Sequence, residues 1–289
     1  AVTGGTVPVI SGTDENLVKV LKRIIDSHPR VRTIYFTDDD FCINKRAAIR
    51  TCKKLSEEEF GGLTFMCYSR ITDITEELVI ALKKANFRLL FIGLESFSEE
   101  VLDEIGKRCN ISQIHRSLEI LQKHDFQVFF NIILTTPASK LVDVQRSVYW
   151  SIKYLEDGFF KGGIVPAIQP IKGTIFEQMY CDFDSKVTCI EGTDERLRVE
   201  TVIWPVDPLA RELLKRYMSG LDQEIEAQMK KNNFIQKRTQ DVALFELRFM
   251  QKLLDEMNFK DFEDCNFKLF PFGIKVQKKD KNIYIHGVS

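Results

Sequence analysis

The chain has few of the residues that build metal sites and disulfide-rich domains. It has seven cysteines and four histidines in 289 residues, and no two cysteines form a CxxC or CxxxC pair. An odd number of cysteines, in a chain long enough to bury a large core, argues against a secreted disulfide framework and favours a reducing cytoplasm. The histidines form no HxxxH pattern, so we expect no histidine-based zinc site.

Long hydrophobic runs and an excess of one charge are also missing. The longest apolar stretches, such as 88–94 and 127–134, fall far short of the ~20 residues that cross a bilayer, so no membrane partner is expected. Lys and Arg number 41 and Asp and Glu 42, and the net charge of -1 does not indicate a nucleic-acid partner. Because GxSxG and P-loop patterns are absent, the sequence favours neither a catalytic triad nor a phosphate-binding loop.

What is present, over about the first 170 residues, is a repeated order of apolar run, polar loop and amphipathic helix. Because every connection between predicted strands carries a helix, we expect parallel pairing with right-handed crossovers. The runs are continuously apolar, which is typical of strands buried on both faces. The first helix has no strand before it, so the predicted sheet lacks its first strand. The predicted strands are 31–36, 63–68, 88–93, 126–134 and 163–169, and the predicted helices are 14–28, 44–59, 75–86, 98–107, 112–124 and 141–156.

The pattern changes in the last third of the chain. An irregular stretch with one predicted strand, 197–203, precedes two long charged helices, 208–232 and 239–258. The end of the chain, 267–276 and 282–288, has the pattern of a β-hairpin. The sequence therefore predicts two parts: an α/β domain over residues 1–180 and an α+β extension over residues 181–289.

Polar side chains gather where the predicted strands of the first part end. In parallel α/β folds, ligands bind at the carboxyl ends of the strands, so this concentration predicts a polar ligand there. The candidates, in chain order, are Asp38, Asp39, Asp40, Arg70, Glu95, Ser96, Asn131 and Pro170.

Each candidate also has a purely structural interpretation. The three aspartates at 38–40 could form a solvated turn, and Arg70 could simply pair with Asp73. Strand parity leaves open which face of the sheet Asn131 occupies. Glu95 directly follows the apolar run FIGL, and a carboxylate beside a buried strand is costly unless it is bound. Glu95 is therefore the strongest candidate for a functional role.

Taken together, these strand ends resemble one known family. IYFTDDDF at 34–41 is similar to an i-F-x-DD-x-F segment, and FMCYSRITD at 65–73 is similar to w-x-c-x-x-R-x-d. FIGLESFS at 91–98, followed by Lys107, resembles i-G-i-E-S-x-s with a downstream i-x-K. PIKGT at 170–174 resembles a P-x-P-G-T turn, with lysine in place of the second proline. These are motifs of radical S-adenosylmethionine (SAM) enzymes, in the subgroup shared by cobalamin-dependent members and methylthiotransferases.

The resemblance implies a partial (β/α)6 TIM-like radical SAM barrel that lacks its first strand. It implies that SAM binds at the strand ends, with Asp38 or Asp39 on the methionine ammonium. Glu95, Arg70 and Asn131 would meet the ribose and carboxylate. Ser96 and Pro170 complete the implied cofactor-binding set.

The resemblance also implies a [4Fe-4S] cluster, at which SAM would yield a 5'-deoxyadenosyl radical. The CxxxCxxC motif that holds the cluster is absent, and AVTGG at 1–5 resembles the stretch after its third cysteine. We therefore expect the cluster ligands to precede Ala1, and this chain alone to be inactive. Cobalamin is a further candidate cofactor, flavodoxin or ferredoxin a candidate electron donor, and methyl or methylthio transfer a candidate reaction on a substrate that the sequence does not name.

Two other functions remain open from the sequence alone. Asp38–Asp40 and Glu95 offer hard oxygen ligands, which would suit a magnesium-dependent barrel lyase or hydrolase. The chain could also be a degenerate barrel without catalysis, retained as a binding module.

Overall fold

The computed structural model describes residues 12–158, 160–168, 184–189, 196–232, 239–257, 275–279 and 282–286. The chain divides into two compact units, Ala1–Leu253 and Leu254–Ser289. The division predicted after residue 180 falls in a stretch outside the described residues and stays a prediction.

The helices and strands follow the predicted order closely. The helices are α1 (Asp14–Ser27), α2 (Lys45–Ser56), η1 (Ile71–Asp73), α3 (Glu76–Lys84), α4 (Glu99–Glu104), α5 (Ile111–Lys123), α6 (Leu141–Glu156), α8 (Pro208–Asn232) and α9 (Thr239–Glu256). The strands are β1 (Thr33–Phe36), β2 (Thr64–Arg70), β3 (Phe87–Glu95), β4 (Gln127–Thr135), β5 (Phe160–Ala167), β6 (Asp184–Cys189), β7 (Arg196–Val202), β8 (Lys275–Lys279) and β9 (Asn282–His286). The bounds of α6 and α8 are those predicted from the sequence, whereas β6 was not predicted.

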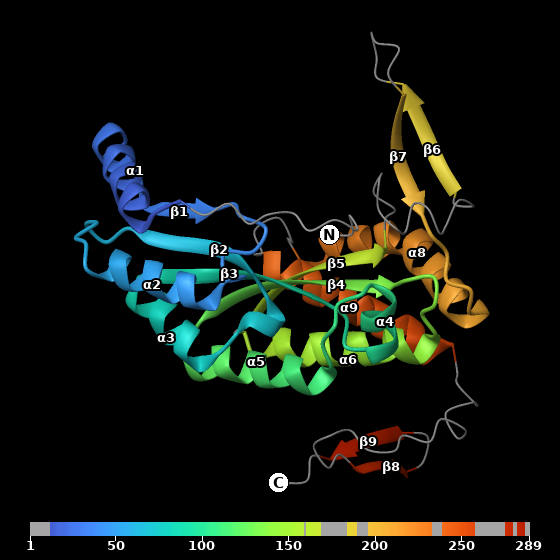
Figure 1. Cartoon of the computed structure of the whole chain (residues 1–289). Helices are drawn as coiled ribbons and strands as arrows, with labels where there is room; N and C mark the ends of the chain where they lie inside the picture. Colours follow the sequence, from blue (N-terminus) through green and yellow to red (C-terminus); the bar gives the residue numbers. More distant parts are fainter. Residues whose placement is uncertain are drawn as a thin grey trace. The chain divides into compact units, whose positions relative to one another are not determined.

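The main sheet has five parallel strands in the order β1-β2-β3-β4-β5. A consecutive order means that every crossover runs in the same direction, and right-handed crossovers then place their helices on one face. Figure 1 shows α2, α3, α5 and α6 together on one face of this sheet. A doubly wound sheet would reverse its strand order and carry helices on both faces. The arrangement therefore confirms the predicted partial α/β barrel.

Burial alternates along the strands, which differs from the prediction that both faces are buried. In β2, Phe65, Cys67 and Ser69 are buried, whereas Met66 is half-buried and Tyr68 exposed. The physical reason is that the described helices cover only one face of the sheet. The apolar residues on the opposite face belong to the barrel interior. On the helix side the core is rich in phenylalanine, with Phe65, Phe87, Phe97, Phe126, Phe130 and Phe160 at most 1% exposed.

Side-chain caps fix where several helices begin. The Thr75 hydroxyl accepts a hydrogen bond from the backbone N–H of Leu78 at 3.3 Å, so Thr75 is the N-cap of α3. Asn110 and Gln113 form a reciprocal capping box at the start of α5. Each cap fixes the residue at which a polar loop ends and a helix begins.

Residues beyond the main sheet form smaller elements. Helix α8 packs on α6, and Asp207 joins their first turns, since its Oδ2 accepts from the N–H groups of Leu141 at 3.2 Å and Ala210 at 2.8 Å. Strands β6 and β7 form an antiparallel pair in the first unit. In the second unit β8 and β9 form the predicted hairpin, although β8 includes Lys278 and Lys279, which the sequence placed in the turn.

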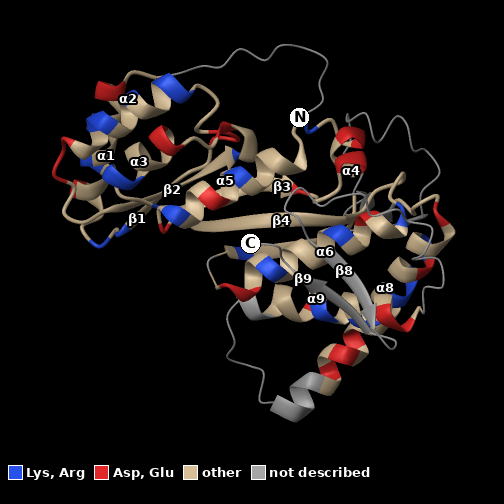
Figure 2. Cartoon of the chain, turned by 90° about the horizontal axis from the view of Figure 1, so that it is seen from below, with Lys and Arg blue, Asp and Glu red and all other residues tan. Residues whose placement is uncertain are grey.

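Acidic and basic residues are concentrated on different helices. Figure 2 shows α2, which carries only basic charges, and α4, which carries only acidic ones. The basic residues of α2 are partly neutralised, because Arg50 lies 2.7 Å from Asp14 and Lys54 lies 3.7 Å from Glu58. In the described part of the chain, no helix combines the length and apolarity that a membrane span requires.

Candidate functional site

One row of residues crosses the sheet at a single level, at the end of β2, near the end of β3 and midway along β4 and β5. Arg70 of β2 is in register with Gly93 of β3, which is in register with Asn131 of β4, and Asn131 with Gly163 of β5. We call these four residues the polar row. Arg70 and Asn131 are exposed and alternate with residues buried against the helices, so the row lies on the face away from the helices. This placement resolves the open question of which face Asn131 occupies.

A second row lies two residues earlier on the same face. It consists of Tyr68, Phe91, Phe129 and Lys161, and we call it the aromatic row. The ring centroids of Tyr68 and Phe91 are 5.2 Å apart, and those of Phe91 and Phe129 are 5.7 Å apart. A ligand at the polar row would therefore have an apolar aromatic surface beside it.

The two glycines make room for polar groups. A Cβ on Gly93 would stand 2.8 Å from Glu95 Oε1 and 2.8 Å from Lys107 Nζ. A Cβ on Gly163 would stand 2.6 Å from Asn131 Oδ1. These distances are shorter than real contacts of a Cβ atom, so a side chain at either position would displace the neighbouring polar group. The glycines thus leave room for three polar side chains beside the polar row.

Glu95 occupies a tight turn at the end of β3. Its φ is 73°, the Ser96 N–H donates to the Leu94 carbonyl at 3.0 Å, and the β3–β4 register shifts between Gly93 and Glu95. The carboxylate of Glu95 pairs with Lys107, with Nζ 3.0 Å from Oε1, and both side chains are half-buried. The ion pair therefore lies beside the polar row and remains reachable by a ligand.

Arg70 is held at one atom by two carboxylates. Its Nε donates to Asp73 Oδ2 at 2.8 Å and lies 2.7 Å from Asp40 Oδ2. The Arg70–Asp73 ion pair, which is the purely structural interpretation of Arg70, is therefore present. Yet the Arg70 side chain is 50% exposed, and among the described residues nothing bonds its Nη1 or Nη2. Arg70 can therefore keep its structural partners and still bind an anion through its terminal nitrogens.

The buried position of Asp40 changes its acidity. Burial, followed by the neighbouring charge of Asp73, raises the pKa of Asp40 to about 6, while Arg70 acts in the opposite direction. The site therefore contains a carboxyl group with a raised pKa.

Not all of the candidates named from the sequence lie at the polar row. Asp38 and Asp39 are exposed in the loop after β1, with no partner among the described residues. Ser96 is 1% exposed, and its hydroxyl faces Ser147 of α6 at 3.0 Å instead of the carboxyl edge. Pro170 lies outside the described residues.

The sequence did not show the part that two residues play in the site. Lys107 stood in the quoted i-x-K motif without a role. The turn that follows α4 brings it back to Glu95, 12 residues earlier. Asp40 was grouped with its exposed neighbours, but it alone of the three contacts Arg70 among the described residues.

The described cysteines do not form a metal site. Cys42, Cys52, Cys67 and Cys109 are free and buried, and burial raises the pKa of the Cys52 thiol to about 12. No group of three His, Cys, Asp or Glu side chains within the described ranges could hold a metal ion. Three thiolates for an iron–sulfur cluster therefore do not come together within the described ranges.

The fold and the site together define a class: a partial parallel α/β barrel with a polar row across the face of its sheet away from the helices. Comparison with known proteins narrows this class. Residues 3–140 match the radical SAM superfamily, the same family that the strand-end motifs resemble. It is also 24% identical over 123 residues to an uncharacterised methyltransferase, PH0819, of Pyrococcus horikoshii, covering 43% of this chain and 27% of that protein.

Two solved structures share the fold over longer stretches. The cobalamin-dependent SAM radical enzyme OxsB, with aqua-cobalamin and SAM bound, matches with a TM-score of 0.59 at 15% identity. That match covers 84% of this chain and 42% of OxsB. The radical SAM methyltransferase TsrM of Kitasatospora setae, with cobalamin and a [4Fe-4S] cluster bound, matches with a TM-score of 0.50 at 13% identity, over 70% of this chain and 41% of TsrM. The chain thus spans less than half the length of each of these proteins.

Proposed function

We propose that this chain is the SAM-binding barrel of a radical SAM enzyme and that SAM lies along the polar row. The observation that carries the proposal is the register of Arg70, Gly93, Asn131 and Gly163 across one face of the sheet, with the Glu95–Lys107 ion pair at Gly93 and the Asn131 amide at Gly163. SAM has an ammonium, a carboxylate, a ribose diol and an adenine. A mixed set of donors and acceptors beside aromatic rings suits such a ligand.

The chemistry of each side chain suggests its part in binding. A guanidinium whose Nη atoms are available binds a carboxylate in bidentate fashion, so Arg70 would hold the methionine carboxylate. The carboxylate of Glu95 can accept both hydrogen bonds of a ribose diol. Asp38 or Asp39 would accept from the methionine ammonium. Lys107 would keep the Glu95 carboxylate turned toward the polar row.

Bound SAM, on accepting one electron, would supply methionine and a 5'-deoxyadenosyl radical able to abstract hydrogen. The part of this chain is to orient the ligand and to limit its contact with water. Phe91 and Phe129 of the aromatic row, with Tyr68, present an apolar surface for this purpose.

Further partners belong to the full-length protein. The described residues offer no cluster ligands, so we propose that a [4Fe-4S] cluster, and cobalamin with it, are bound by segments outside them. The reaction class that fits is methyl or methylthio transfer, in the cytoplasm, with a flavodoxin or ferredoxin as electron donor. The substrate itself is not identified.

Calorimetric titration of SAM into the full-length protein tests this proposal. We expect saturable binding, weakened about tenfold or more by Glu95→Ala, because the loss of hydrogen bonds to a charged group costs roughly 1.5–3 kcal/mol. Glu77→Ala is the matched control, since Glu77 is exposed on α3 and, among the described residues, bonds to no member of the polar row. No SAM binding, or thermal stabilisation by Mg²⁺ alone, would overturn the proposal and favour the magnesium-dependent alternative.

A further inference from the structure

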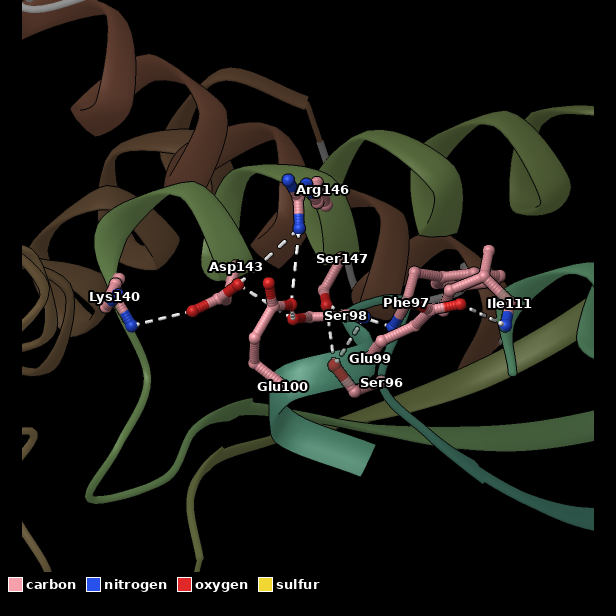
Figure 3. Close-up of polar contacts among 10 residues, drawn as sticks. All are labelled: Ser96, Phe97, Ser98, Glu99, Glu100, Ile111, Lys140, Asp143, Arg146 and Ser147. Carbon is pink, nitrogen blue, oxygen red and sulfur yellow. Dashed lines mark hydrogen bonds and ion pairs between the residues drawn. The ribbon is translucent and has the colours of Figure 1, made fainter. Parts of the chain in front are cut away.

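A network of buried polar side chains binds the segment after Glu95 to helix α6. It consists of Ser96, Ser98, Asp143 and Ser147, and we call it the serine network (Figure 3). All four residues are at most 2% exposed. Burying polar side chains this deeply costs free energy unless they are hydrogen-bonded. The hydrogen bonds within the network offset that cost.

Ser147 binds the turn at two points. Its Oγ accepts the N–H of Phe97 at 3.1 Å and lies 3.0 Å from the Oγ of Ser96, so one hydroxyl donates to the other. The Ser96 Oγ also accepts the N–H of Ser98 at 3.1 Å. Two successive backbone N–H groups after Glu95 are thereby fixed by hydroxyls.

Asp143 lies one helical turn before Ser147 on α6 and binds the side chain of Ser98. The Ser98 hydroxyl lies 2.7 Å from Asp143 Oδ1 and 2.8 Å from Glu100 Oε2, and donates to one of them. Asp143 Oδ2 accepts the backbone N–H of Lys140 at 2.8 Å, which ties the carboxylate to the start of α6. Asp143 is thus a rigid acceptor for the turn.

The turn needs such support because of Glu95. A φ of 73° is unfavourable for any residue with a Cβ, and a three-residue turn of this kind is rare and strained. Such a conformation persists only where surrounding contacts enforce it. Without the bonds at Phe97 and Ser98, the backbone at Glu95 could relax toward ordinary strand geometry and turn its carboxylate away from Lys107.

We infer that Ser147 and Asp143 are positioning residues for SAM, which hold the Glu95 carboxylate at the polar row without touching the ligand. This inference rests on the proposed function. It adds that helix α6, on the opposite face of the sheet, sets the affinity of the site.

The test is a double-mutant cycle on SAM affinity in the full-length protein. We expect Ser147→Ala to raise the Kd for SAM about tenfold and Asp143→Asn, which preserves shape, by about threefold. In a Glu95→Ala background, Ser147→Ala should change the Kd by less than about twofold, since no carboxylate remains to be positioned. Equal effects of Ser147→Ala in both backgrounds would overturn the inference, because a general loss of stability acts whether or not Glu95 is present.

Ser151→Ala is the matched control. Ser151 lies one turn further along α6, is fully buried, and its Oγ has no hydrogen-bond partner among the described residues. Removing its hydroxyl should leave the Kd unchanged. A tenfold loss in this variant as well would contradict the inference.

Hydrogen exchange separates this inference from the proposed function. In Ser147→Ala the amides of Phe97 and Ser98 should exchange at least about tenfold faster than in the wild type, with or without SAM. Unchanged exchange would overturn the positioning role even if SAM binds. Failure of the wild type to bind SAM would instead overturn the proposed function.

Discussion

Lys107 Nζ lies 3.0 Å from Glu95 Oε1, and each atom is 2.8 Å from the point where a Cβ on Gly93 would stand. The ion pair therefore occupies the space that a side chain at residue 93 would take. Because Gly93 is in register with Arg70 and Asn131, the pair lies at the centre of the polar row.

Gly93→Ala should displace the ion pair with little loss of stability. The φ of Gly93 is not in the left-handed region, and the added methyl meets only the ends of two flexible side chains, which can move. We expect the Kd for SAM to rise about tenfold or more and the free energy of unfolding to change by less than about 1 kcal/mol. Gly12→Ala, with nothing within 4 Å of the new Cβ, is the control. A variant with wild-type affinity would place SAM elsewhere.

Lys107→Met should weaken SAM binding by leaving the Glu95 carboxylate without its cation. We expect an increase of about fivefold in Kd, the size of a partly buried ion pair, with Lys107→Arg close to the wild type. Calorimetry measures both, and Lys84→Met on the exposed surface of α3 should change nothing. Tighter binding by Lys107→Met would mean that the lysine competes with the ligand for Glu95.

Asp40 should make stability depend on pH. Its pKa is raised by burial from 3.8 to about 6, so between these values the folded state binds more protons at this site than the unfolded state. Stability from this group is therefore lost as the pH rises from about 4 to about 6, and the loss is complete above that range.

Asp40→Asn should remove this dependence. Urea unfolding across the same pH range should show the wild type losing stability relative to Asp40→Asn as the pH rises. Asp38→Asn, at an exposed position, should follow the wild type. Parallel profiles for the wild type and Asp40→Asn would show that Asp40 is not the titrating group.

Much of the fold could be predicted from the sequence because the apolar runs and helical periodicities are strong. Helices α6 and α8 begin and end where predicted. The pattern could not show that the inner face of the sheet is only partly covered, since an apolar run looks the same whichever face the helices cover. Strand β6 was not predicted because its sequence, DSKVTC, has only one strongly apolar β-branched residue.

The site was predictable as a set of strand ends, but its geometry was not. Strand parity fails at Glu95, where the turn and the register shift redirect the chain, so the burial of Ser96 could not be foreseen. Lys107 reaches Glu95 only through the turn after α4. Ser147 meets Phe97 from 50 residues away, a contact that no local pattern encodes.

A crystal structure of the full-length protein with SAM bound tests the central claim most directly. The account predicts that the ribose hydroxyls contact the Glu95 carboxylate, that the methionine carboxylate contacts Arg70, and that Asn131 borders the ligand. Density for SAM on another face of the sheet, with Glu95 still bound only to Lys107, would contradict it.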